Sequence, residues 1–126
     1  MSSIASTSKF DKVVAIRMSE EQLQQAVIDM AHTYGWMVAH FRAAQTAKGW
    51  STPVSADGKG FPDLTLALHG QVIFAELKSE MGKMSKEQCR WQLELMPWEC
   101  ASQKYYIWRP SDWMSGEIER VLRSTL

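Results

Sequence analysis

The chain has 126 residues, of which 45% are hydrophobic and 22% charged, and its 14 basic and 14 acidic residues give a formal net charge of zero. This length fits one domain with a substantial core, and the neutral balance does not by itself indicate a nucleic-acid binder. Cys89 and Cys100 stand in no metal-ligand spacing, and no apolar stretch has the length of a membrane span or a secretory signal. We therefore expect a cytoplasmic protein without membrane contacts.

The N-terminal part of the chain is expected to contain a tail and a helix. Residues 1–12 are Ser-rich and predict a flexible tail, so that a single domain spans residues 13–126. Ser19 and Gln22 have the spacing of a helix capping box, and apolar residues then recur at helical spacing until Gly35. The pattern predicts a helix between Ser19 and Gly35.

A strand and a long loop follow this helix. Residues 36–41 are typical of a strand, and glycines and prolines break residues 42–61 into a loop. The loop carries Arg42, Lys48 and Lys59 and ends beside an acidic residue, so it could guide a DNA backbone into a site. A surface insertion without a binding role is an equal alternative, because three basic residues are few.

The next segment predicts a β-hairpin that brings two acids together. Residues 64–68 and 71–76 are largely apolar, and His69-Gly70 between them suits a tight turn. Asp63 then stands at the start of the first strand and Glu76 near the end of the second, at the same end of the sheet. Lys78 shares a strand face with Glu76, because side chains on a strand repeat every second residue.

This arrangement indicates a metal site. Two nearby carboxylates repel each other unless a cation neutralises them, and oxygen ligands without partner cysteines or histidines favour Mg²⁺ or Mn²⁺ over zinc. Such an ion activates a water and stabilises charge on a phosphate, and Lys78 could orient that water. Hydrolysis of a phosphodiester fits these parts. The alternative is a surface ion pair at a strand end, which the combined spacing disfavours.

A second helix is predicted after the hairpin. Ser85 and Gln88 form another capping box, which opens a helix to about Pro97. Lys86 and Arg90 share its opening turns and could contact phosphate, although solvated charges on a helix are the ordinary explanation.

The C-terminal part completes the expected fold. Residues 104–108 predict a strand, Arg109-Pro110 a turn, and the remainder a final helix. The order α-β-β-β-α-β-α predicts an α/β fold with a mixed central β-sheet flanked by helices. Six tryptophans exceed what a core of this size needs, so we expect some at a symmetric homodimer face.

The spacing of the acids and the lysine, PD-x(12)-ExK, resembles the VRR-NUC family of the PD-(D/E)xK nuclease superfamily. The similar features run in family order from about residue 19 to 123: Ser19-Glu20, Gln24, Val27-Ile28, Gly35-Trp36, Gly60-Phe61-Pro62-Asp63-Leu64, Ala75-Glu76-Leu77-Lys78, Ser85 with Gln88 and Trp91, and Ile107-Trp108-Arg109-Pro110.

The resemblance implies a restriction-endonuclease-like core and specific roles for its residues. Asp63 and Glu76 would bind the metal, the backbone carbonyl of Leu77 would add a ligand, and Lys78 would assist catalysis. Gln88 would face the site and help to arrange the metal water or the lysine; the alternative is that it is only the capping partner of Ser85. Single-module proteins of this family in phages and bacteria are associated with dimers that cut branched DNA.

Two residues are alternative candidates for the site residue that the first helix supplies. The superfamily usually has a glutamate on this helix, and Glu20 stands at its expected start, while counting back from Gly35 points to Gln24. The two share a helix face, so one could meet the metal and the other position substrate. Glu20 could instead be a first-turn acid favoured by the helix dipole, and Gln24 a solvated polar residue.

The expected function is that of a Mg²⁺- or Mn²⁺-dependent, structure-selective DNA endonuclease, specifically a Holliday junction resolvase in a bacterial host cell and encoded by a phage or the host. A 5′-flap or restriction-type nuclease would share the metal site. From other classes, a non-catalytic DNA-binding module would not need Asp63, Glu76 and Lys78 together, and a Trp-rich interaction protein would show no metal dependence.

Overall fold

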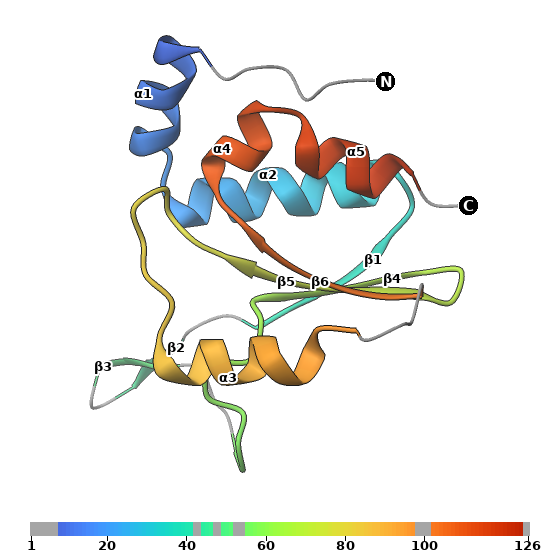
Figure 1. Ribbon diagram of the computed structural model, residues 1–126. Helices are drawn as coiled ribbons and strands as arrows, with labels where there is room; N and C mark the ends of the chain where they lie inside the picture. The colour runs from blue at the N-terminus through green and yellow to red at the C-terminus, as the bar shows by residue number, and fades with distance from the viewer. Residues whose placement is uncertain (1–7, 42–43, 47–48, 52–54, 98–101, 125–126) are drawn as a thin grey trace.

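The computed structural model describes residues 8–41, 44–46, 49–51, 55–97 and 102–124. Its sheet lies between α2, α4 and α5 on one face and α3 on the other (Figure 1). The elements in chain order are α1 (Lys9–Arg17), α2 (Glu20–Thr33), β1 (Met37–His40), β2 (Ala44–Thr46), β3 (Gly49–Ser51), β4 (Leu64–Leu68), β5 (Gln71–Leu77), α3 (Lys86–Leu95), β6 (Gln103–Trp108), α4 (Pro110–Met114) and α5 (Glu117–Arg123). Among the described residues, no helix is both long and apolar enough to cross a membrane.

The main sheet has four strands in the order β1-β4-β5-β6. The β1–β4 and β4–β5 pairs are antiparallel, whereas β6 returns through α3 and pairs parallel with β5. His69 (φ 51°) and Gly70 (φ 82°) form the turn between β4 and β5, and two positive φ values are what a two-residue hairpin loop requires. The predicted hairpin and the predicted mixed sheet flanked by helices are both confirmed.

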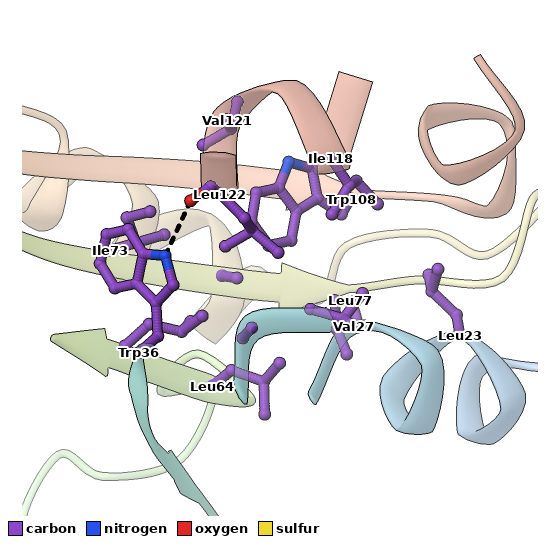
Figure 2. Packing of buried hydrophobic residues seen from close by; sticks show 13 residues of the cluster. Leu23, Val27, Trp36, Leu64, Ile73, Leu77, Trp108, Ile118, Val121 and Leu122 are labelled. Atoms are coloured by element: carbon purple, nitrogen blue, oxygen red, sulfur yellow. Dashed lines mark hydrogen bonds between the residues drawn. The ribbon is translucent and has the colours of Figure 1, made fainter. Parts of the chain in front are cut away.

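The hydrophobic core lies on the face of the sheet that α2 and α5 cover (Figure 2). Alternate strand residues point into it because side chains along a strand alternate between faces. Trp36 joins the core to α5, since its indole Nε1 donates a hydrogen bond of 3.0 Å to the carbonyl of Leu122. Each fully buried leucine there stabilises the fold by about 1.5–3 kcal/mol. The fully buried leucines are Leu23, Leu64, Leu66, Leu77 and Leu122.

The opposite face of the sheet is covered more thinly. No residue of α3 is buried, although the helix spans Lys86–Leu95. Its start is the predicted capping box: the Ser85 hydroxyl accepts from the Gln88 amide, and the Gln88 side chain accepts from the Ser85 amide. The α2 helix begins in the same way at Ser19 and Gln22. Both predicted helix starts are confirmed.

The N-terminal segment differs from the expectation. A tail was expected through residue 12, but α1 begins at Lys9 because the Ser8 hydroxyl caps it and accepts from the Asp11 amide at 3.1 Å. Ala15 is buried, and α1 contacts α4. The serine that suggested a loose segment therefore starts a helix.

Two further elements differ from the predicted order. A short antiparallel hairpin of β2 and β3 lies inside the segment that was expected to be loop throughout. The expected final helix is divided into α4 and α5, because Gly116 between them takes a left-handed conformation (φ 83°).

Candidate active site

The two acids of the hairpin meet at one end of the sheet. The register pairs Leu64 with Ala75, which sets Asp63 beside the end of β5. An Asp63 carboxylate oxygen accepts a hydrogen bond of 2.8 Å from the backbone amide of Leu77. The juxtaposition that strand periodicity predicted is therefore present.

Glu76 is a buried acid with one amide donor. It is 1% exposed, and its Oε2 accepts a hydrogen bond of 2.9 Å from Gln88 Nε2. Gln88 Oε1 at the same time accepts from the Ser85 amide at 2.8 Å. The two ends of one side-chain amide therefore make the cap contact to Ser85 and a contact to Glu76, so the capping role of Gln88 does not exclude a role in the site.

The environment of Glu76 favours its protonated form. Burial, followed by the charge of Asp63 and a hydrogen bond with Asp63, raises the pKa of Glu76 to about 9, and Lys78 acts in the opposite direction. At neutral pH Glu76 therefore holds a proton. A bound cation could take the place of that proton, which is how the donor set fits a divalent metal.

The structure distinguishes between the two first-helix candidates. Glu20 is exposed as a whole, but burial of its carboxylate and then the charge of Asp63 raise its pKa, while Lys78 and a backbone hydrogen bond from Ser79 lower it. Gln24 is half-buried one turn later. In the described part of the chain, no hydrogen bond joins Gln24 to Asp63, Glu76 or Lys78. Of the two, Glu20 is the residue whose pKa responds to the charge of Asp63.

The segment before Asp63 is fixed against the start of α3. Gly60 has a φ of +85°, and a Cβ atom there would lie 2.6 Å from the Cβ of Glu87. The Phe61 ring meets Trp91 edge-on at 5.0 Å, and Trp91 Nε1 donates to the carbonyl of Asp57 at 3.0 Å. These contacts hold Asp63 and α3 in one arrangement. These contacts join residues that are far apart in sequence, so the sequence does not predict them. The only indication of them is the aromatic character of Phe61 and Trp91.

Tyr105 is a site neighbour that the sequence did not single out. It lies on β6 opposite Phe74 and is half-buried. Burial, followed by the charge of Glu76, raises the pKa of Tyr105 to about 12, so its hydroxyl stays protonated near the acids. The register of the parallel β5–β6 pair determines this placement, and that register cannot be read from the sequence.

The predicted DNA-contacting residues have varied surroundings. Lys59 and Arg90 line a surface pocket of about 410 Å³ together with Glu87 and Glu94, and Lys59 Nζ lies 4.0 Å from Glu87 Oε2. The pocket is therefore of mixed charge. Lys86 is exposed on the first turn of α3. Arg42 and Lys48, which were expected to contact DNA as well, lie outside the described residues.

Within the described residues, no group of three or more His, Cys, Asp or Glu side chains is placed to hold a metal ion. The donors that the site offers are the carboxylates of Asp63 and Glu76, to which the resemblance adds the Leu77 carbonyl.

Comparisons of the chain with protein-family models, with curated proteins and with solved structures find no match. The site must therefore be interpreted from its own chemistry.

Proposed function

We propose that the protein is a Mg²⁺- or Mn²⁺-dependent DNA endonuclease of the VRR-NUC family, with a restriction-endonuclease-like core. The observation that carries the proposal is the buried Glu76 carboxyl, which lies close to the Asp63 carboxylate and accepts a hydrogen bond from the Gln88 amide. Burying an acid is unfavourable for folding, and perturbed acids of this kind concentrate at functional sites.

The metal would be held by Asp63 and Glu76, with the Leu77 carbonyl as a further ligand. When bound, it supplies an activated water and stabilises the negative charge of the phosphate under attack. The Leu77 amide and the Gln88 amide orient the two carboxylates through hydrogen bonds of 2.8 and 2.9 Å. Such donors keep carboxylate ligands in one orientation.

Lys78 supplies the positive charge of the site. It lies near enough to Glu76 and Glu20 to lower the pKa of each. Its ammonium group can orient the attacking water and offset charge on the phosphate.

We propose branched DNA as the substrate, with a four-way junction as the first candidate and a 5′ flap as the second. The support is the resemblance to single-module nucleases that act on such DNA as dimers. A homodimer would place one site on each of two strands, as symmetric incision requires. A solution mass of about twice 14.4 kDa tests the dimer.

The proposal is tested by incubating purified protein with labelled four-way junctions, 5′ flaps and linear duplex in Mg²⁺, Mn²⁺ or EDTA. We expect paired metal-dependent nicks in the junction, which Asp63→Ala and Lys78→Ala abolish. The matched controls Asp29→Ala and Lys104→Ala change exposed residues away from the site and should cleave like the wild type. Metal-dependent cutting of 5′ flaps alone would keep the metal site but replace the four-way junction with the flap as the proposed substrate. The absence of metal-dependent cleavage of any DNA would favour a non-catalytic binding module.

A further inference from the structure

The turn that follows Lys78 is held by one guanidinium group. Nη1 of Arg109 donates to the carbonyl oxygens of Ser79 at 2.8 Å and Gly82 at 2.7 Å, with a longer contact of 3.3 Å to that of Glu80. The turn itself is closed by the Gly82 amide, which donates to the Ser79 carbonyl at 3.1 Å. Arg109 therefore contacts nearly every carbonyl of this turn.

A second contact joins the same turn to the start of α4. An Oε1 atom of Glu80 accepts a hydrogen bond of 2.9 Å from the Ser111 amide. Arg109 is itself held in place, because its backbone amide donates a hydrogen bond of 2.8 Å to the Asp112 carboxylate. The backbone amide of Lys78 also donates a hydrogen bond of 3.0 Å to the Trp108 carbonyl. The junction of β6 and α4 thus determines where the turn lies.

The turn lies beside two of the charged groups of the candidate site. Lys78 immediately precedes it, and the Ser79 backbone lies near enough to the Glu20 carboxylate, at the start of α2, to lower the pKa of that group. In Figure 1 the yellow connection that leaves β5 passes beside this end of α2 before it descends to α3. A displacement of the turn would move Lys78 relative to Asp63 and to Glu20.

We propose that Arg109 is a positioning residue of the active site, because it fixes the turn that follows Lys78 and lies beside Glu20. This inference rests on the proposed nuclease function. It assigns Arg109 no contact with DNA, although an arginine near a nuclease site would ordinarily be taken for a phosphate-binding group.

The test separates positioning from DNA binding. Arg109→Met keeps the aliphatic stem and removes every donor. We expect its single-turnover cleavage rate to fall about 10- to 100-fold, as expected for misplaced catalytic groups, with the dissociation constant for DNA in EDTA unchanged within about 2-fold. Arg109→Lys keeps a charged donor and should recover part of the rate. Arg120→Met, which removes an exposed arginine paired with Glu117, is the matched control and should cleave like the wild type.

Two further variants keep the inference falsifiable. Glu80→Ala removes the contact to Ser111 and should lower the cleavage rate in the same direction, which decides the matter if Arg109→Met does not fold. The effects of Arg109→Met and Glu20→Gln should be less than additive, because the turn that Arg109 holds lies beside the Glu20 carboxylate.

The outcomes are distinct. If the wild type cleaves DNA and a folded Arg109→Met variant cleaves equally fast, the inference fails while the nuclease function stands. Weaker DNA binding at an unchanged cleavage rate would also overturn it, in favour of a phosphate contact. If the wild type shows no cleavage, the nuclease function fails first and the inference falls with it.

Discussion

Glu76 shows most directly how the site conflicts with stability. Its carboxyl group is buried, it faces another carboxyl group, and Gln88 gives it one amide donor. Low-dielectric surroundings disfavour the charged form, so the group keeps a proton that an exposed glutamic acid would lose. The residue that the proposed chemistry needs most is therefore unfavourable for folding at the pH where the metal would bind.

The pH dependence of stability follows from this residue. In the folded protein the pKa of Glu76 is about 9, against 4.5 for the free side chain, so between these values the folded state holds a proton that the unfolded state has lost. The free energy of unfolding of the metal-free protein should therefore fall as pH rises through this window. Glu76→Gln should flatten that decline and melt at a higher temperature than the wild type at the alkaline end. Thermal unfolding in EDTA across the window measures both, and parallel curves for the two proteins would contradict the assignment.

Gln88 allows the capping role and the site role to be separated. Gln88→Glu keeps an acceptor for the Ser85 amide, as a capping box allows, but replaces the donor to Glu76 with a second acid. We expect cleavage to fall about 10-fold or more, in the range found for residues that orient metal ligands. Gln22→Glu makes the same change in the capping box of α2 and should cleave like the wild type. If the two substitutions changed the cleavage rate equally, Gln88 would have a capping role only.

At the scale of elements, features that depend on neighbouring residues could be predicted from the sequence, whereas features that depend on distant residues could not. The capping boxes at Ser19 and Ser85 and the turn at His69-Gly70 depend on neighbours in sequence, and all three were predicted correctly. The α1 helix was missed because its cap, Ser8, lies in a Ser-rich segment that also suits a tail. The break at Gly116 was missed because apolar spacing continues across it.

The same distinction holds for the candidate site. Strand periodicity was enough to bring Asp63 and Glu76 together, since one short hairpin carries both. The clamp of Arg109 on the turn after Lys78 connects residues 27 to 30 apart in sequence, and the placement of Tyr105 depends on a parallel register. No local pattern specifies either of them.

Two glycines with nearly the same backbone conformation test the contact between the loop and α3. Gly60 and Gly70 have φ values of +85° and +82°, but a Cβ at Gly60 would collide with Glu87, whereas nothing lies within 4 Å of one at Gly70. Gly70→Ala should lower the free energy of unfolding by about 1–2 kcal/mol through backbone strain alone. Gly60→Ala should lower it by at least about 1 kcal/mol more and reduce cleavage as well. Urea denaturation compares them, and equal losses would mean that the loop can move away from α3 without penalty.

At the scale of the whole molecule, the hydrophobic core and the candidate site occupy different parts of the sheet. The face under α2 and α5 carries the hydrophobic core, and the end of the sheet between α2 and α3 carries the acids. The chain is neutral overall, so the proposed attraction to DNA requires an uneven distribution of its charges. Lys59 and Arg90 stand among acids, which limits how much either adds.

The contribution of these basic residues can be measured through salt. If Arg90 contacts one phosphate, Arg90→Ala should reduce the slope of the logarithm of the DNA association constant against the logarithm of salt concentration by about 1. The single-turnover cleavage rate at saturating protein should not change. Lys104→Ala, an exposed cation on β6, is the control and should leave the slope as it is. An unaltered slope for Arg90→Ala would place the DNA elsewhere on the surface.

The central claim is that Asp63 and Glu76 form a metal site, and calorimetric titration with Mn²⁺ at neutral pH tests it most directly. Because the pKa of Glu76 is about 9, binding should release about one proton, which is measured by repeating the titration in buffers of different ionisation enthalpy. Asp63→Asn and Glu76→Gln should each weaken binding strongly, and Glu76→Gln should also abolish the proton release. Mn²⁺ binding that both variants leave intact, or no binding by the wild type, would contradict the account.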